Sequence, residues 1–407
     1  MNNLFSTTIL NVWRINTKGK PIKIGQFAYD YKGNTFFKYD YEYINSKDAI
    51  AIDPFSLPLR QGIFRSRRLE PPFFAFDDTL PDAWGMAILE KRVKKRLDRY
   101  CALELIDTSG VGALFFSKND KLSAPTWISI SVLKECMEEA HSFELRQADM
   151  VFNYLQVSGT SAGGARPKAS FVDDNGDVWL VKFPSRFDPD KKTATFVEYE
   201  GIEFAKQIDL PVPEAKVIEY PSGACLAVKR FDIIPDIDTP FKGRQALLSF
   251  RTICGGMEQS ERGYEALSVF LRRISANPRQ DILFFFRHML LNCLILNTDD
   301  HLKNFSVLLH DEGWRLSPAY DLIGNLWGMK QHTTPVNGKK DNFSKKDFIE
   351  AGLKMGIKKE DIHFEICRAL KAANIYLEKI SNIPGTGQLE LAIRKRLEDL
   401  GEDSSDT

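Results

Sequence analysis

The sequence feature that most constrains the fold is a run of apolar residues at positions 282–296, which ends in a polar loop. The run contains Arg287 and His288, so it is too short and too polar to cross a bilayer. We expect it to form a helix that is buried in a protein core. Most of the chain from about residue 250 onward has helical periodicity. We therefore expect this helix to belong to a helical carboxy-terminal half.

The amino-terminal part has a different pattern, in which apolar and polar residues alternate as they do in strands. The alternation extends from residue 8 to about residue 60, and residues 31–34 have the composition of a hairpin turn. Further along, the patterns predict helices at 80–100, 131–156 and 196–208, a turn and a strand at 173–183, and hairpins at 214–231 and 305–317. This order is typical of a protein-kinase-like fold with an additional β-rich module in front.

The length of 407 residues predicts two or three domains or lobes. We expect an α+β, two-lobed fold with an amino-terminal subdomain at 1–140, a kinase amino-terminal lobe at 141–247, an all-helical carboxy-terminal lobe at 248–400 and a disordered tail at 401–407. With 43% hydrophobic residues the chain can fill a core, which excludes global disorder. The 55 basic and 55 acidic residues argue against nucleic-acid binding through bulk charge.

Six cysteines are dispersed along the chain, and none forms a Cys-x-x-Cys pair. This spacing argues against a zinc ribbon or a thioredoxin-type site and indicates reduced thiols in a cytosolic protein. The first residues lack the charged segment and long apolar run of a signal peptide. We therefore expect a cytoplasmic protein.

The polar loop contains Asp299 and Asn304, which have the D-x-x-x-x-N spacing of a kinase catalytic loop. Phosphoryl transfer needs a carboxylate to accept the proton of the attacking hydroxyl and a nearby oxygen ligand for Mg²⁺. The adjacent Asp300 would be matched by Phe305, which cannot bind a metal, so the spacing selects Asp299. The alternative is a helix C-cap and turn without a chemical role.

Asp321 lies seventeen residues after Asn304, and the predicted hairpin between them would return the chain to the same place. Its position corresponds to the Asp of a DFG segment, which binds Mg²⁺. One Asn and one Asp supply the hard oxygen ligands that suit Mg²⁺, whose other positions are filled by waters and phosphate oxygens. The alternative is that Asp321 caps a helix.

Lys182 is flanked by apolar residues in a predicted strand, although burying an ammonium group requires a partner. The ATP-binding lysine of kinases occupies such a strand and pairs with nucleotide phosphates and with a helix glutamate. Glu198, early in the next predicted helix, is the expected partner, and Glu200 is the second choice. The alternative is an exposed lysine of an edge strand.

A run of small residues at 158–168 precedes that strand. Such a run lets backbone N–H groups approach phosphates closely, although the Lys-Ser/Thr pair of a Walker A loop is missing. A flexible linker is the alternative. The run also carries hydroxyl groups that could accept a phosphate, at Ser158, Thr160 and Ser161.

The basic residues at 65–68 and 91–96 favour a solvated face over a nucleic-acid surface. The six histidines show no metal-ligand spacing, and we expect His301 to be structural rather than a base.

Taken together, these residues resemble the HipA family, the kinase toxins of type II toxin–antitoxin modules. The resemblance covers nearly the whole chain and rests on six motifs in the same order. They are L-P-D-A-W-G at 80–85, G-A-R-P-K at 164–168, K-R-F-D at 229–232, T-D-D-H-L-K-N-F-S at 298–306, S-P-A-Y-D-L at 317–322 and V-N-G-K at 336–339.

The resemblance implies an ATP- and Mg²⁺-dependent serine/threonine protein kinase. It implies Asp299 as the catalytic base, Asn304 and Asp321 as Mg²⁺ ligands, and Lys182 as a ligand of the ATP phosphates. The further nucleotide contacts that it implies are Gly163, Gly164, Glu198, Lys229, Phe231, His301 and Lys303.

The resemblance also implies autophosphorylation on a serine of the glycine-rich loop. The family's serine lies three residues before the glycine of the G-A-x-x-K segment, which is Ser161 here, and Ser158 is a second candidate. A phosphate there would add about −1.5 to −2 charge where the ATP phosphates bind, which would inactivate the enzyme. The loop departs from the family pattern in its glycine pair and in the Arg-Pro before the lysine, so both serines stay open.

Members of the family phosphorylate aminoacyl-tRNA synthetases and so arrest translation and growth. A small helix-turn-helix antitoxin, HipB, neutralises them and recruits them to operator DNA. The resemblance therefore implies a HipB-like partner, a synthetase as protein substrate, DNA contact only through the antitoxin, and no membrane. Two alternatives are a catalytically weak co-repressor bound to the antitoxin and a small-molecule kinase on the same fold.

Overall fold

The computed structural model of the chain describes residues 7–30, 32–66, 73–146, 153–155, 166–221, 223–234, 237, 239–255, 263–329 and 331–402. The chain divides into two compact units. The first consists of residues 1–181 and 230–248, and the second of residues 182–229 and 249–407. The chain therefore passes from one unit to the other after residues 181, 229 and 248, and both units are discontinuous in sequence.

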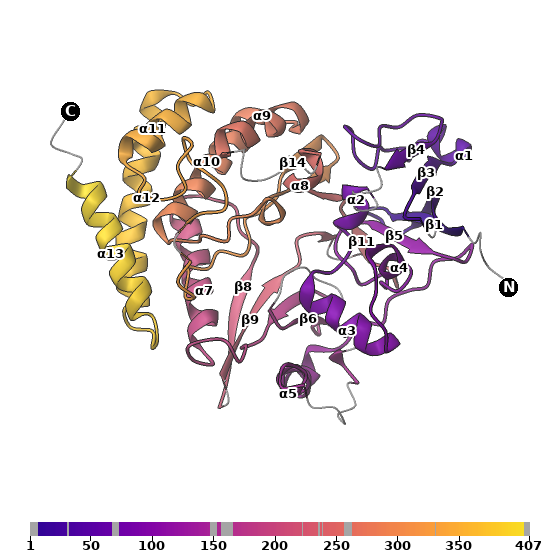
Figure 1. Cartoon of the computed structure of the whole chain (residues 1–407), viewed down its shortest axis with the longest axis horizontal. Coiled ribbons are helices and arrows are strands. Elements are labelled where there is room, and N and C mark those ends of the chain that lie inside the picture. The colour runs from indigo at the N-terminus through magenta and orange to yellow at the C-terminus, as the bar shows by residue number, and fades with distance from the viewer. Residues whose placement is uncertain are drawn as a thin grey trace. The chain divides into compact units, whose positions relative to one another are not determined.

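The first unit begins with a five-stranded sheet in the order β4-β3-β2-β1-β5 (Figure 1). Its strands are β1 (Thr8–Ile15), β2 (Pro21–Tyr29), β3 (Thr35–Tyr39), β4 (Phe64–Ser66) and β5 (Leu114–Ser117). All neighbours are antiparallel, and the register pairs Tyr29 with Thr8 on one side and with Thr35 on the other. The strands predicted between residues 8 and 60 are confirmed.

A cluster of aromatic rings forms the core beneath this sheet. The ring of Phe76 meets those of Phe27, Phe37 and Phe116 edge-on, at centroid distances of 5.2, 5.4 and 5.0 Å. All four side chains are buried. Edge-to-face contact is the favoured geometry of aromatic pairs, and burial of each ring adds about 1.5–3 kcal/mol of hydrophobic free energy. The β-rich module therefore has a core of its own.

The helices of the first unit are α1 (Tyr41–Ile44), α2 (Phe74–Asp77), α3 (Ala83–Val93), α4 (Arg99–Leu103), η1 (Ile130–Val132) and α5 (Leu133–Glu144). The prediction of one helix at 80–100 was wrong, because the chain adopts a left-handed conformation at Lys94, where φ is 55°. A second helix then begins after Asp98, whose carboxylate accepts the backbone N–H of Cys101 at 2.7 Å. α5 is shorter than the helix predicted at 131–156, of which 147–152 and 156 lie outside the described residues.

The remaining strands of the first unit are short. They are β6 (Lys168–Val172), β7 (Val178–Lys182), β10 (Ile233–Ile234), β11 (Gly243–Arg244) and β12 (Leu247–Ser249). β7 and β12 run across the points at which the chain enters the second unit. The predicted turn and strand at 173–183 are confirmed, and Lys182 is the last residue of β7.

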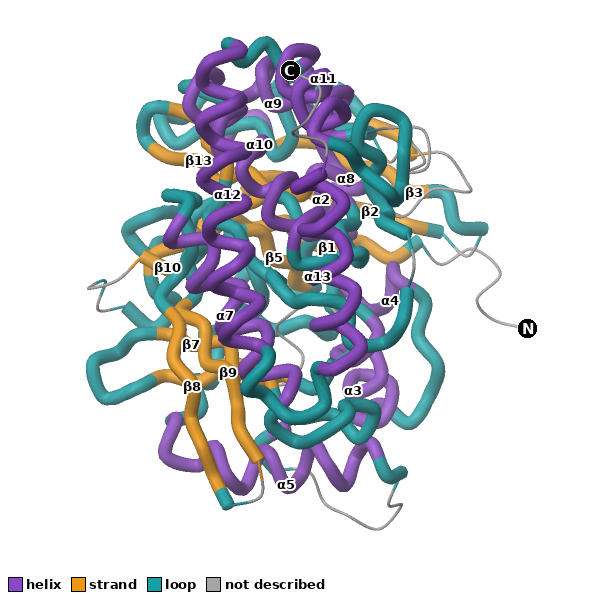
Figure 2. Tube along the Cα trace, turned by 90° about the vertical axis from the view of Figure 1, so that its left-hand side faces the viewer, coloured by secondary structure: helices purple, strands orange, loops and turns teal. Residues whose placement is uncertain are grey.

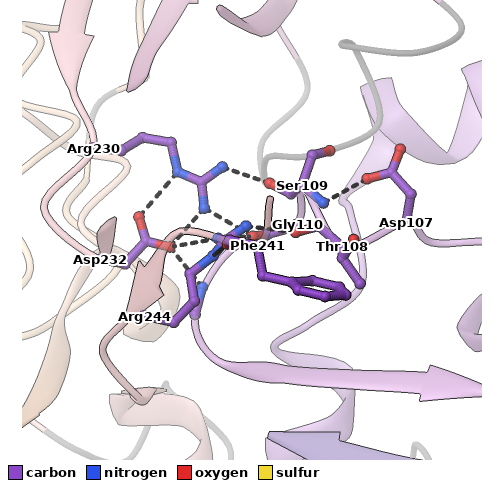
Figure 3. A network of polar contacts seen from close by, with 9 residues as sticks. Asp107, Thr108, Ser109, Gly110, Arg230, Asp232, Phe241 and Arg244 are labelled. Carbon is purple, nitrogen blue, oxygen red and sulfur yellow. Dashed lines mark hydrogen bonds and ion pairs between the residues drawn. The ribbon is translucent and has the colours of Figure 1, made fainter. Parts of the chain in front are cut away.

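Two buried arginines and one aspartate join separate segments of the first unit (Figure 3). Arg230 donates to Asp232 Oδ2 at 2.6 Å and to the carbonyl oxygens of Ser109 and Gly110 at 2.5 and 2.8 Å. Arg244 donates to the carbonyl of Gly110 at 2.8 Å. Burial alone would raise the pKa of Asp232, but the two guanidinium groups outweigh it and the pKa is lowered. Burial, with repulsion from Arg230, lowers the pKa of Arg244 to about 9.

The second unit is mainly helical. Its helices are α7 (Thr193–Gln207), α8 (Phe250–Ile253), α9 (Tyr264–Ile274), α10 (Pro278–Leu294), η3 (Leu302–Asn304), α11 (Lys345–Lys354), α12 (Lys359–Ile380) and α13 (Gly387–Glu402). Two antiparallel hairpins join them, β8 (Ala215–Tyr220) with β9 (Gly223–Lys229) and β13 (Ser306–His310) with β14 (Gly313–Leu316). The predicted helix at 196–208 and both predicted hairpins are confirmed.

The apolar run forms α10, in which every residue from 285 to 294 is buried. α10 packs against α7, α9, α12 and α13, and α12 lies along α7 (Figure 2). Within this core the guanidinium of Arg287 donates to Glu365 Oε1 of α12 at 2.6 Å. The prediction of a buried helix is confirmed. Among the residues that the structure describes, no helix combines the length and the apolar surface that spanning a membrane would need.

Candidate active site

Lys182 forms the centre of an ion-pair cluster in the second unit. Its ammonium group donates to Glu198 Oε1 and, at 2.5 Å, to Asp321 Oδ1. The side chain is 12% exposed. Burial alone would lower the pKa of Lys182, but the carboxylates of Asp321 and Glu198 outweigh burial and raise the pKa above its ordinary value. The lysine is therefore charged throughout the physiological pH range.

α7 supplies the glutamate of this cluster. Glu198 is buried and lies on the second turn of α7. Glu200, the second choice from the sequence, is half-buried near Lys379 and Glu203. Burial raises its pKa, and the neighbouring lysine partly offsets that effect. The helix therefore directs Glu198, rather than Glu200, to Lys182.

The loop between α10 and β13 carries Asp299 and Asn304. The backbone carbonyl of Asp299 accepts the N–H of His301 at 2.9 Å and the side-chain amide of Asn304 at 2.8 Å. His301 precedes η3 and places Nε2 4.0 Å from Asp299 Oδ1. Asn304 is buried, whereas 63% of the Asp299 side chain is exposed. We refer to residues 299–304 as the base loop.

The carboxylate of Asp299 is harder to ionise than an ordinary aspartate. Surrounding protein that displaces water raises its pKa, His301 opposes the effect, and the nearby carboxylates of Asp321 and Asp300 add to it. A carboxylate with a raised pKa is a stronger base than a free one, which suits a group that accepts a proton.

Asp300 has the opposite environment, because it is completely buried. Its carboxylate accepts the hydroxyl of Tyr264 at 2.7 Å and the backbone N–H groups of Thr333 and Thr334 at 2.8 and 3.1 Å, and its Oδ2 lies 3.2 Å from His332 Nδ1. These contacts connect the base loop to α9 and to the segment 332–334. Asp300 thus holds the loop in place, and Asp299 is the carboxylate that is open to solvent.

Asp321 occupies the segment after β14, with a left-handed φ of 60°. Its carboxylate is 35% exposed and contacts Lys182, while its backbone carbonyl accepts the side-chain amide of Asn297 at 3.0 Å. Among the described residues, no three His, Cys, Asp or Glu side chains form a group that could hold a metal by itself. Asn304 and Asp321 offer two oxygen ligands, which fits Mg²⁺ because that ion takes most of its ligands from water and phosphate oxygens.

The remaining predicted residues are Lys229, Lys303, Phe231 and those of the glycine-rich run. The Lys229 ammonium lies 3.9 Å from Glu214, and its backbone N–H donates to the Glu214 carbonyl at 2.8 Å. Lys303 contributes its carbonyl, which accepts the Tyr320 hydroxyl at 2.7 Å. Phe231, in the first unit, is half-buried. Gly163, Gly164, Ser158 and Ser161 lie outside the described residues.

Sequence reasoning missed Asn297 and Gly201, two residues that touch the Asp321 segment. Asn297 was one polar residue among several in the loop, and only the folded chain shows that it is buried against a carbonyl. Gly201 lies one turn after Glu198, and a methyl group at its Cα would lie 2.1 Å from the Leu322 carbonyl oxygen. A glycine within a predicted helix was the available signal.

Two family models match the chain. The model described as the HipA-like C-terminal domain matches residues 160–375, which is more than half of the chain, and the HipA N-terminal domain matches residues 15–117. The chain belongs to the HipA family. The resemblance of the six motifs is thereby confirmed, and the HipA-like C-terminal domain contains all the residues of the ion-pair cluster and the base loop.

The structure is similar to that of HipA from Shewanella oneidensis, solved in complex with HipB and operator DNA. The match has a TM-score of 0.73 at 15% identity and covers 96% of both chains. It shows a common fold, and the predicted α+β, kinase-like fold class is confirmed. Two proteins of Sinorhizobium fredii that are named as candidate kinases, Y4dM and Y4mE, are 24% and 25% identical to this HipA-family chain, and each match covers 78% of it.

Proposed function

We propose that this chain is an ATP- and Mg²⁺-dependent serine/threonine protein kinase that acts as the toxin of a toxin–antitoxin module. The observation that carries the proposal is the ion-pair cluster, in which Lys182 contacts Glu198 and Asp321. A lysine held by two carboxylates is positioned before nucleotide binds, so little ordering is needed when phosphates arrive. The kinase names of the Sinorhizobium relatives agree with this function.

The proposed roles follow from the environments of the side chains. Asp299 accepts the proton of the attacking hydroxyl, since it is exposed and has a raised pKa. Lys182 would bind the phosphates of ATP. Asn304 and Asp321 would hold Mg²⁺, which would neutralise charge on the transferred phosphoryl group. With Asp321 as a metal ligand, Glu198 would keep Lys182 in place. The protein thus contributes positioning and charge, which phosphoryl transfer mainly requires.

We further propose nucleotide contacts from Gly163, Gly164, Lys229, Phe231, His301 and Lys303 and autophosphorylation at Ser161 or Ser158. A phosphate on either serine would bring negative charge to the loop that approaches the ATP phosphates, so it would inhibit the kinase.

We propose a HipB-like helix-turn-helix antitoxin as partner, with DNA bound only through it. The whole-length similarity to HipA that was solved with HipB and operator DNA supports this partner. An aminoacyl-tRNA synthetase is the proposed substrate, and the cytoplasm is the proposed location.

The test is intact mass followed by phosphopeptide mapping, for the wild type and for Asp299→Ala after incubation with Mg-ATP. We expect a mass increase of about 80 Da, the mass of one phosphate, on Ser161 or Ser158 in the wild type and none in Asp299→Ala. Asp311→Ala is the matched control, because Asp311 is an exposed aspartate in the turn between β13 and β14. It should be phosphorylated like the wild type.

The same proteins are then incubated with a panel of purified aminoacyl-tRNA synthetases and labelled ATP. Transfer to a synthetase by the wild type and the control, but not by Asp299→Ala, supports the proposed substrate class. If the wild type neither labels itself nor any synthetase and binds no Mg-ATP, the kinase proposal is wrong. Transfer to small metabolites alone would replace it with a small-molecule kinase.

A further inference from the structure

Asn297 is a buried amide that lies between the base loop and the Asp321 segment. Its side chain is 3% exposed. The amide nitrogen Nδ2 donates to Asn292 Oδ1 and to the backbone carbonyl of Asp321, both at 3.0 Å. Its backbone N–H donates to the Asn292 carbonyl at 2.9 Å. Both hydrogens of the amide are used, so the orientation of this side chain is fixed.

The Asp321 carbonyl is a position at which such a bond matters. Asp321 has a φ of 60°, and Leu296, directly before Asn297, has a φ of 57°. Both residues are in the left-handed region, which non-glycine residues rarely adopt and which surrounding contacts must therefore maintain. Rotation of the Asp321 backbone would break the bond from Asn297 and would also turn the carboxylate away from Lys182. The amide bond and the ion pair therefore favour the same backbone conformation.

The bonds of Asn297 continue to the other side of the site. Asn292 Nδ2 donates to the Tyr264 hydroxyl at 3.0 Å, and that hydroxyl donates to Asp300 Oδ2 at 2.7 Å. Asn292, Tyr264 and Asp300 are all buried. A continuous series of buried hydrogen bonds thus connects the backbone of Asp321 to the residue next to Asp299. Buried series of this kind are rigid, because each broken bond leaves a polar group without water.

We propose that Asn297 is a positioning residue that fixes the Asp321 backbone for metal binding and couples it, through Asn292 and Tyr264, to the base loop. The inference rests on the proposed function, in which Asp321 is a Mg²⁺ ligand. Asn297 acts through Asp321 and does not touch the reacting atoms. Its loss should therefore weaken the metal site first and the affinity for ATP at saturating Mg²⁺ much less.

The experiment compares full-length wild type, Asn297→Ala, Asn292→Leu and the control Asn374→Ala. Asn374 is an exposed residue of α12 whose amide also donates to a backbone carbonyl, that of Leu370 at 2.8 Å. The half-saturating Mg²⁺ concentration is measured at saturating ATP, and the KM for ATP at saturating Mg²⁺. Binding of Mn²⁺ in the presence of a non-hydrolysable ATP analogue is followed by electron paramagnetic resonance, which needs no turnover.

For Asn297→Ala we expect the half-saturating Mg²⁺ and the Mn²⁺ dissociation constant to rise about fivefold or more, as the loss of one buried hydrogen bond implies. The KM for ATP should change by less than about twofold. Asn292→Leu should shift the metal constants in the same direction and by less, because Asn297 keeps its bond to Asp321. If Asn297→Ala does not fold, Asn292→Leu tests whether the hydrogen bonds of Asn297 support the metal site. Asn374→Ala should match the wild type.

Loss of activity in Asn297→Ala with unchanged metal constants would overturn the inference, since it would mean that Asn297 only stabilises the fold. A wild type that binds the metal–analogue complex but transfers no phosphate would overturn the proposed function instead. In that case the Mn²⁺ constants still test the role of Asn297.

Discussion

Two adjacent aspartates of the base loop have opposite surroundings and therefore different roles. Asp299 is exposed and has a raised pKa, whereas Asp300 is buried and is held by four groups from other segments. The D-x-x-x-x-N spacing selects Asp299 rather than Asp300, and the different environments of the two carboxylates agree with that choice. The proposed base, Asp299, thus lies in a loop that the following residue, Asp300, holds in place.

Replacement of Asp299 should remove activity without loss of stability. Because its pKa in the folded state lies above the ordinary 3.8, ionisation of Asp299 costs folding free energy at every pH above the raised value. Asp299→Asn removes this cost. We expect kcat to fall about 10²- to 10⁴-fold and the Tm at pH 7 to stay equal or rise. Kinase assays and calorimetry of Asp299→Asn beside Asp311→Asn test this, and a Tm several degrees below that of the wild type would contradict it.

The pH dependence of transfer should depend on His301. Protonation of Asp299, the proposed base, should stop transfer, so we expect activity to be lost as the pH falls through the raised pKa of this group. The charge of His301 lowers that pKa. His301→Ala should therefore move the acid limb of the kcat profile to higher pH. His141→Ala, an exposed histidine of α5, should leave the limb in place. A limb that stays or moves to lower pH would argue against His301 as a neighbour of the base.

Sequence patterns predicted the charged members of this site better than the neutral ones. The spacing of Lys182, Glu198, Asp299 and Asp321 was predicted from a kinase pattern. All four residues lie in the second unit, and Glu198 and Asp321 contact Lys182. Asn297 has no such spacing rule. Its role depends on the left-handed backbone of Asp321, which no local pattern indicates.

At the scale of elements, α7 positions Glu198 by packing closely against the Asp321 segment. Gly201, one turn after Glu198, faces the backbone of Leu322, where a Cβ would lie 2.1 Å from the carbonyl oxygen. A side chain at this position must move the helix or the segment, because backbone atoms cannot rotate away. The absence of a side chain at Gly201 therefore allows Glu198 and Asp321 to reach the same lysine.

Gly201→Ala should separate these elements. We expect a loss of about 1–3 kcal/mol in the free energy of unfolding, as overpacking usually costs, together with a lower kcat and a higher KM for ATP. Denaturant unfolding and steady-state kinetics give both quantities. Gly387→Ala is the matched control, because nothing lies within 4 Å of a Cβ built at the start of α13. Wild-type stability and kinetics in Gly201→Ala would show that α7 does not depend on this contact.

Element predictions failed where a backbone conformation overrides periodicity. The continuous helix expected at 80–100 is broken at Lys94, although the basic face of the segment continues through the break. Helical spacing describes which side chains face a core, but it does not show where a residue adopts a left-handed φ. α10 was predictable because most of its positions from 282 to 294 are apolar, in agreement with its burial.

At the scale of the whole molecule, the order of strand-rich and helical parts and the six motifs were enough to predict the fold class. The assignment of chain segments to the two units was not predictable from these patterns. Residues 230–248 belong to the first unit although they follow 182–229, which belong to the second. The K-R-F-D motif supplies Arg230 and Asp232 to the buried cluster with Arg244, and nothing in its spacing indicates that partner.

Removal of the carboxylate from this cluster should destabilise the first unit. Asp232→Ala leaves two buried guanidinium groups without their common counter-charge, which should cost about 3–5 kcal/mol. Hydrogen exchange should show lost protection at 108–112, 230–234 and 239–244, with little change in α10. Asp174→Ala, an exposed aspartate in the turn before β7, is the control. Equal loss of protection in both units would mean that the cluster does not act on the first unit alone.

Because the chain passes between the units after residues 181, 229 and 248, the first unit is completely translated before the second unit is complete. Every residue of the Arg230–Asp232–Arg244 cluster is translated before the base loop exists, so the first unit can close while the ribosome is still adding α9 and α10. The last member of the ion-pair cluster is residue 321 of 407. A ribosome must therefore translate both units as far as Asp321 before the proposed toxin can assemble the site that would halt translation.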